Sequence, residues 1–133
     1  MKISIRTFIA STCCALLFAT PSAAKTAQNA ADCAVLMAAE LSMLERKSSI
    51  RSLSSDLTTA YSNYIEAFSS LAAEKGMSRQ ELSKYTQQRF NRYVQHAEYF
   101  ETNPDNTSSL AYRRIMRKCD QMSKENKIAP IDF

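Results

Sequence analysis

The sequence predicts an all-α fold, a small antiparallel helical bundle closed by one disulfide. Apolar residues recur at the three- and four-residue spacing of amphipathic helices along most of the chain after residue 30. One glycine and three prolines among 133 residues leave few turn residues for the many reversals of an all-β fold. Two cysteines near opposite ends of that region, Cys33 and Cys119, supply the predicted disulfide.

Residues 1–24 are typical of a cleaved secretory signal peptide. Two basic residues precede an uncharged, mostly apolar run at 8–19, and small residues at 22–24 offer a cut before Lys25. A helix of that length spans about 18 Å, against roughly 30 Å of bilayer hydrocarbon, which disfavours an anchor. We therefore expect a periplasmic or secreted protein without a transmembrane segment after signal removal.

Residues 25–133 are predicted to form a single helical domain. Its helices are expected at about 31–47, 55–75, 79–101 and 107–124. In the first of them the apolar face consists of Cys33, Leu36, Met37, Leu41 and Leu44. Asn29 and Asp32 are the candidates for the residue that caps its N-terminus.

The second predicted helix depends on how the serine-rich stretch at 48–55 is interpreted. As a connection, this stretch gives four helices in up-down-up-down order, which we favour because serines weaken helix propensity. As helix, it gives one rod over 31–75 and a long helical hairpin. Gly76 ends the second helix under either interpretation, since glycine is common just past a helix C-terminus.

The third predicted helix has the clearest start signal in the chain. Ser78 and Glu81 form a capping box, and Met77 and Leu82 flank it as a hydrophobic staple. A turn at 103–106 then leads to the last helix. The apolar face of that helix consists of Tyr112, Ile115, Met116, Cys119 and Met122.

The two cysteines outside the signal peptide indicate a bridge between the first and the last helix. Export delivers them to an oxidising compartment, where an even pair is normally joined. Both topologies bring Cys33 and Cys119 together, because the first and last helices are antiparallel neighbours. Their spacing fits no zinc motif, and the chain has one histidine, so we expect no metal.

Composition excludes several classes of function. Removal of the signal peptide takes away Lys2 and Arg6, so 15 basic residues face 13 acidic ones and the net charge falls from +4 to +2. A charge this small argues against a nucleic-acid partner. A single glycine excludes glycine-rich phosphate loops. No Gly-x-Ser-x-Gly or Cys-x-x-Cys motif occurs, so we expect no enzyme and no cofactor.

A polar layer is predicted inside the bundle. Glu40 lies within the apolar face of the first helix, where a carboxylate is costly unless it is hydrogen-bonded or paired. Arg89, Tyr112 and Tyr64 (or its neighbour Tyr61) are expected at the same level. The alternative is that Glu40 reaches solvent at the edge of the core.

Two candidate binding surfaces combine cations with aromatic rings or with further cations. The third helix carries a stripe at four- and three-residue spacing, made of Tyr85, Arg89, Arg92, His96 and Tyr99. The last helix carries a cationic face, made of Arg113, Arg114, Arg117 and Lys118. Such side chains recognise phosphate, carboxylate or acidic protein surfaces, although they equally suit an ordinary solvated helix face.

The sequence therefore predicts an exported, non-catalytic binding protein of the bacterial periplasm. Its expected partner is another envelope protein or an anionic surface ligand, and its oligomeric state is left open. One alternative is a small-ligand or metal carrier with a polar pocket inside the bundle. Another is a stress or chaperone-like protein that exposes apolar surface when it is loosened.

Overall fold

The computed structural model of the chain describes residues 21–47 and 55–128, and these residues form helices without any strand. The four α-helices within them are α2 (Pro21–Lys47), α3 (Ser55–Glu74), α4 (Arg79–Thr102) and α5 (Leu110–Glu125). A short 3₁₀ turn, η1 (Thr107–Ser109), precedes α5. The prediction of an all-α bundle is confirmed.

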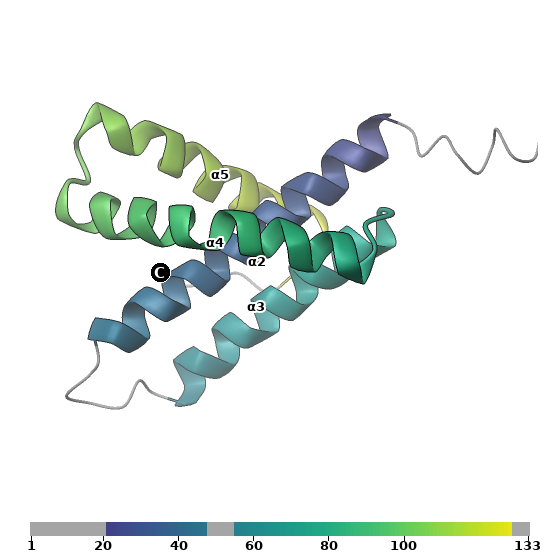
Figure 1. Cartoon of the computed structure of the whole chain (residues 1–133), viewed down its shortest axis with the longest axis horizontal. Helices are drawn as coiled ribbons and strands as arrows, with labels where there is room; N and C mark the ends of the chain where they lie inside the picture. Colours follow the sequence, from purple (N-terminus) through teal and green to yellow (C-terminus); the bar gives the residue numbers. More distant parts are fainter. Residues whose placement is uncertain (1–20, 48–54, 129–133) are drawn as a thin grey trace, which may run out of the picture.

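Helix α2 is the centre of the bundle. It packs against α3, α4 and α5, and each helix runs antiparallel to the next one along the chain (Figure 1). Helix α4 crosses α2 obliquely, and α5 returns alongside α4 (Figure 1). Because α3 runs back along α2, the two are separate helices and not one continuous rod. The connection between them, at 48–54, lies outside the described residues.

The start of α2 corrects the sequence prediction. The helix begins at Pro21, ten residues before the expected start at about 31. Proline is favoured in the first turn of a helix, and the alanine-rich segment that follows has high helix propensity. Large apolar residues are missing there because Ala30 and Ala31 pack closely on Leu71 and Ala72 of α3. Neither Asn29 nor Asp32 is therefore an N-cap, since both lie inside the helix.

The predicted signal peptide stays a prediction. Residues 1–20 lie outside the described residues, and residues 21–24 form the first turn of α2. None of the described helices is long and apolar enough to cross a membrane.

A disulfide joins α2 to α5 in the largest part of the core. Cys33 and Cys119 are bonded, with their Cα atoms 5.5 Å apart, and both are buried. Leu36 of α2 and Phe68 of α3 are also fully buried in this cluster. The predicted disulfide is thus confirmed, and it fixes the last helix onto the central one.

The turn between α3 and α4 follows the sequence signals closely. Gly76 has a φ of +107°, and the N–H groups of Gly76 and Met77 donate to the carbonyls of Ala73 and Ala72 at 3.1 and 3.0 Å. This is the Schellman arrangement that ends many helices. Ser78 and Glu81 then form the predicted capping box, in which each side chain accepts the other residue's backbone N–H.

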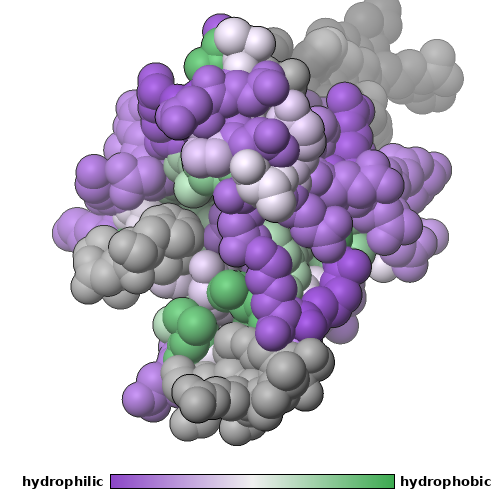
Figure 2. Space-filling view, turned by 90° about the vertical axis from the view of Figure 1, so that its left-hand side faces the viewer, coloured by the Kyte–Doolittle hydropathy of each residue, from purple (hydrophilic) through white to green (hydrophobic). Residues whose placement is uncertain are grey.

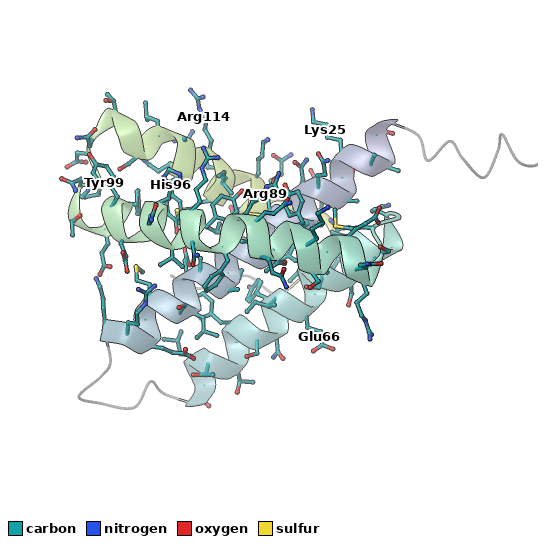
Figure 3. All side chains as sticks on the ribbon, viewed as in Figure 1. Lys25, Glu66, Arg89, His96, Tyr99 and Arg114 are labelled. Carbon is teal, nitrogen blue, oxygen red and sulfur yellow. A yellow bond between two sulfur atoms is a disulfide. The ribbon has the colours of Figure 1, made fainter. Side chains whose placement is uncertain are left out.

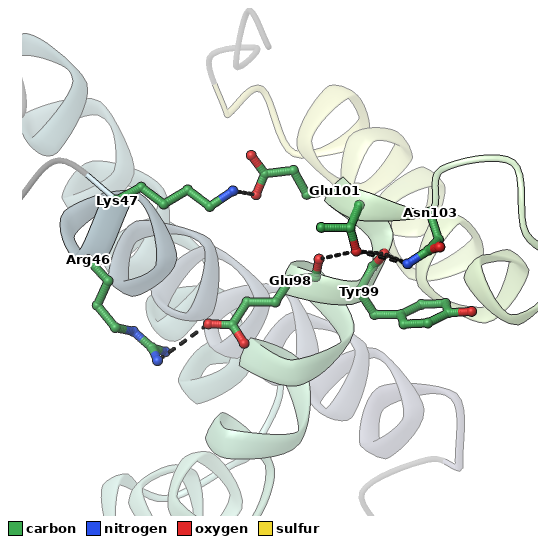
Figure 4. Close-up of polar contacts among 7 residues, drawn as sticks. Arg46, Lys47, Glu98, Tyr99, Glu101 and Asn103 are labelled. Carbon is green, nitrogen blue, oxygen red and sulfur yellow. Dashed lines mark hydrogen bonds and ion pairs between the residues drawn. The ribbon is translucent and has the colours of Figure 1, made fainter.

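At the opposite end of α4, two ion pairs join it to the end of α2. Arg46 lies 3.3 Å from Glu98, and Lys47 pairs with Glu101 (Figure 4). All four side chains are about half exposed, so solvent and salt weaken both pairs. They orient the helix ends more than they stabilise the fold.

Candidate functional site

Two carboxylates on α2, Glu40 and Asp32, each accept hydrogen bonds from two tyrosine hydroxyls. The four tyrosines come from the three helices that surround α2. We call the two groups the Glu40 cluster (Glu40, Tyr61, Tyr112) and the Asp32 cluster (Asp32, Tyr85, Tyr93).

The Glu40 cluster is enclosed by the bundle. Tyr112 of α5 donates to Oε1 of Glu40 at 2.6 Å, and Tyr61 of α3 donates to Oε2 at 3.1 Å. Burial raises the pKa of Glu40, and the two hydroxyl donors oppose that shift. Burial and the nearby carboxylate raise the pKa of both tyrosines, so their hydroxyls stay protonated donors. The cluster ties α3 and α5 to α2.

The predicted polar layer is only partly assembled in this cluster. Glu40 and Tyr112 meet as expected, and the α3 partner is Tyr61. Tyr64 is buried one turn away, with its ring centroid 6.2 Å from that of Phe68. Arg89 lies elsewhere, with its guanidinium carbon 3.6 Å from the centre of the Tyr85 ring. Within the described part of the chain, no ion pair joins Arg89 to Glu40.

The Asp32 cluster was missed by sequence reasoning. Tyr85 and Tyr93 of α4 both donate to Oδ1 of Asp32, at 2.6 and 2.9 Å. An aspartate near a presumed helix start resembles a cap, so its role inside the helix was hidden. The alanine-rich segment before it was the signal that the helix begins earlier. Because Arg89 stacks on Tyr85, this cluster also holds an arginine in place.

A groove of about 260 Å³ lies between α4 and α5. Its lining residues are Arg89, Arg92, Tyr93 and His96 from α4 and Ala111, Tyr112 and Ile115 from α5. Figure 3 shows Arg89 and His96 on the side of α4 that faces α5. None of the lining residues is acidic, and two of them are arginines. The carboxylates of Asp32 and Glu40 lie behind this lining, where they accept the hydroxyls of Tyr93 and Tyr112.

The two tyrosines of the groove have their hydroxyls directed into the bundle. Tyr93 donates to Asp32 and Tyr112 donates to Glu40. Both tyrosines are buried, and the one hydrogen that each hydroxyl can donate is already used. Polar recognition in the groove is left to Arg89, Arg92 and His96, whose side chains suit oxyanions.

The structure thus brings together three of the five residues of the predicted α4 stripe. Arg89, Arg92 and His96 share the groove, whereas Tyr85 is bonded to Asp32 beside it. Tyr99 is exposed farther along α4, outside the lining.

The predicted cationic face of α5 lies outside the groove. Its residues Arg114, Arg117 and Lys118 are exposed, and Arg113 is half-buried. Arg114 points away from α4 (Figure 3). The sequence pattern did not indicate that Ala111, Tyr112 and Ile115 of the same helix form the other wall of the groove.

Other hollows in the described residues have a different character. A cavity of about 20 Å³ beside Met37, Phe68 and Met116 has room for about one water molecule. Two hollows of about 300 and 310 Å³ flank the start of α2, and each includes both a lysine and a glutamate in its lining. The groove between α4 and α5 is thus distinguished by its uniform charge.

The surface at the α4–α5 end is mainly hydrophilic. Figure 2 looks onto this end and shows apolar residues only in small patches between polar ones. Among the described residues, the exposed large apolar side chains are Tyr99 and Leu110. No three His, Cys, Asp or Glu side chains in the described ranges gather so that they could hold a metal ion.

Comparison with known proteins adds no relative. The chain matches no protein-family model, no curated protein and no solved structure. Its function has to be argued from the groove and its surroundings.

Proposed function

We propose that the chain is an exported, non-catalytic binding protein of the bacterial periplasm that binds small anionic ligands in the α4–α5 groove. The observation that carries this proposal is the lining of the groove, where Arg89, Arg92 and His96 occur without an acidic side chain. Clefts lined by one sign of charge concentrate ligands of the opposite sign.

The surroundings of Arg89 support binding. Asp32 accepts the hydroxyl of Tyr85, and the ring of Tyr85 stacks on the guanidinium of Arg89. An arginine held in one orientation loses less conformational entropy when it binds an anion. The groove therefore has part of its geometry set before a ligand arrives.

The chemistry of the lining residues favours binding over catalysis. His96 lies among arginines, tyrosines and aliphatic side chains, and the lining contains no serine, cysteine or carboxylate that would act with it. The lining therefore offers His96 no partner for nucleophilic or acid–base catalysis. The expected role is to hold an anion.

The test is isothermal titration calorimetry of the mature, disulfide-bonded protein with inorganic phosphate and with small carboxylates. Arg92→Gln should weaken binding by about tenfold or more, because a charge-assisted hydrogen bond contributes roughly 1.5–3 kcal/mol. The matched control is Arg79→Gln, an exposed arginine in the first turn of the same helix, outside the groove. Equal affinity of the two variants would contradict the proposal.

Export itself needs a separate measurement. Intact-mass analysis of the protein from its native envelope should show a chain that begins at Lys25 and lacks two hydrogens because Cys33 and Cys119 are joined. An intact N-terminus in the envelope fraction would contradict cleavage at this site.

A further inference from the structure

We propose that the exposed side of α5 is a peripheral membrane-binding surface that docks on bilayers with anionic phospholipid headgroups. This side, which we call the α5 surface, consists of Leu110, Arg114, Arg117 and Lys118, and all four side chains are exposed. None of them lines the α4–α5 groove, so the proposal does not depend on a ligand bound there.

Positive charge is concentrated on this helix. Residues 110–119 contain four basic residues and no acidic one, although residues 25–133 hold 15 basic and 13 acidic residues. Among the described residues, no ion pair reaches the three cations of the α5 surface, whereas Lys124 of the same helix pairs with Asp120. An anionic surface would supply the neutralising charge that the protein itself does not provide.

The start of α5 makes this charge unfavourable for the protein on its own. Residues three and four positions apart are neighbours on a helix, so Arg114 is repelled by both Arg117 and Lys118. Arg114 is also only four residues from the start of α5, the positive end of the helix dipole, and the first turn contains no acidic residue. The hydroxyl of Ser109 does not cap the helix and instead donates to the carbonyl oxygen of Asn103 at 2.8 Å. Anionic headgroups at this end would offset these repulsions.

Exposed apolar side chains lie at the same end of the molecule. Among the described residues, the large apolar side chains that are exposed are Tyr99 and Leu110, at 39% and 42%. Both flank the turn between α4 and α5, and Leu110 lies one helical turn before Arg114 on the same side of α5. Figure 3 shows Tyr99 at this end of α4. Aromatic and apolar side chains beside cations suit the boundary between headgroups and acyl chains, which an acidic polymer in solution does not offer.

The shape of the α5 surface also suits a bilayer. Arg114 and Arg117 line neither the groove nor the other hollows named above, and Arg114 points outward (Figure 3). A projecting row of cations can contact several headgroups at once, whereas a small ligand needs a concave site. Three cations with one apolar side chain predict reversible binding that salt weakens.

The test is cosedimentation of the mature, disulfide-bonded protein with two kinds of vesicle, phosphatidylcholine alone and an equal mixture of phosphatidylcholine and phosphatidylglycerol. The wild type should bind only the mixed vesicles, and added salt should release it. Arg114→Gln with Arg117→Gln should lower the partition coefficient on the order of thirtyfold, since each basic residue near an anionic surface contributes about fivefold. The matched control, Arg79→Gln with Lys84→Gln, removes the same charge from exposed positions in the first half of α4 and should bind like the wild type.

Two further variants separate insertion from charge, and the α5 surface from the groove. Leu110→Gln keeps every charge and should weaken binding to the mixed vesicles about fivefold, because an apolar side chain no longer enters the interface. Arg92→Gln, in the groove, should leave vesicle binding unchanged. Circular dichroism melting of each variant confirms that it is folded before it is tested.

Three outcomes would overturn the proposal. The first is that the mixed vesicles do not bind the wild type, or that the α5 double variant and its α4 control bind them equally. The second is that soluble polyglutamate binds as tightly as the mixed vesicles and Leu110→Gln changes neither, since the surface then recognises acidic chains. The third is that Arg92→Gln abolishes vesicle binding while the α5 double variant keeps it, since headgroups then enter the groove; this result would support the proposed function.

Discussion

The two carboxylate clusters on α2 use the same chemistry for different purposes. Glu40 is almost fully buried and accepts one hydroxyl on each oxygen, from two different helices. Asp32 is half-buried and accepts both of its hydroxyls on one oxygen, from α4 alone. The Glu40 cluster therefore joins α3 and α5 to α2, while the Asp32 cluster joins α4 to α2 and positions Tyr85 and Tyr93 beside the groove.

With the groove as the proposed binding site, this difference predicts that one cluster contributes mainly to stability and the other mainly to binding. Burial makes each hydrogen bond of the Glu40 cluster hard to replace by water. Partial exposure makes those of the Asp32 cluster replaceable. Both tyrosines of this cluster bear on the groove, since Tyr85 stacks on Arg89 and Tyr93 is in the lining, whereas only Tyr112 of the Glu40 cluster does. Loss of Glu40 should thus be felt in stability, and loss of Asp32 in binding.

The largest expected effect comes from opening the disulfide, which holds α5 and Tyr112 against α2. Closing a loop of 86 residues in sequence restrains the unfolded chain by on the order of 4.5 kcal/mol. Cys33→Ser with Cys119→Ser should lower the unfolding free energy by about 4 kcal/mol, as measured by urea denaturation.

Hydrogen exchange on the same double variant sharpens the comparison. Amides of α5 should lose protection before those of α4, because α5 loses its covalent link and keeps one hydrogen bond to Glu40, whereas α4 keeps both of its hydrogen bonds to Asp32. Equal loss of protection in both helices would show that the two clusters do not act independently.

Removal of Glu40 should have the next largest effect on stability. Glu40→Ala leaves two buried hydroxyls without their acceptor and should cost about 3 kcal/mol in urea denaturation. Glu40→Gln keeps one acceptor oxygen and the side-chain volume, so its cost should be clearly smaller. A stable Glu40→Ala protein would show that water or a repacked core replaces the carboxylate.

Asp32→Ala should cost only about 1 kcal/mol of stability, because solvent reaches this half-buried site. Its effect on binding should be larger than that of Glu40→Gln, since Tyr85 and Tyr93 lose their common acceptor. Titration of the groove with a carboxylate measures this. The comparison would fail if Glu40→Gln weakened binding more than Asp32→Ala did.

The smallest effect concerns pH. The pKa of Glu40 is raised above its usual 4.5 by burial, so its ionisation destabilises the folded state. The wild type should therefore gain stability relative to Glu40→Gln as the pH falls from neutral toward about 4.5, and lose it as the pH rises through the raised pKa. Urea denaturation of both proteins over this range checks the sign.

Glu81 provides the opposite sign as an internal control. Hydrogen bonds from Ser78 lower the pKa of Glu81, so its contribution to stability is present above about 4.5 and is lost on acidification. The difference in unfolding free energy between the wild type and Glu81→Gln should therefore become smaller as the pH falls. If the stability difference from the wild type changed with pH in the same direction for Glu40→Gln and Glu81→Gln, the raised pKa of Glu40 would be contradicted.

Local signals made much of the fold predictable from the sequence. The capping box at Ser78 and the glycine at position 76 depend on neighbours a few residues away, and both are found as predicted. The disulfide followed from the number of cysteines and from the antiparallel order of the helices. The prediction for the start of α2 was wrong because an alanine-rich segment shows little hydrophobic periodicity, although alanine has high helix propensity.

The candidate site depends on how the helices pack against one another, which the local pattern of one sequence does not reveal. The periodicity put Arg89, Arg92 and His96 on one face, and they do share the groove. Which α3 tyrosine meets Glu40 depends on the register between helices, so Tyr61 and Tyr64 could not be separated. The α5 residues that line the groove could be predicted only if the packing of α5 against α4 were already known.

The tyrosine clusters also give the protein an optical signature. The chain has six tyrosines and no tryptophan, so its near-ultraviolet absorbance comes mainly from the phenol rings. In four of them the pKa is raised, by burial and by the adjoining carboxylate. Conversion to phenolate in alkali should therefore remain incomplete while the helices hold together, and its completion would record the moment at which they separate.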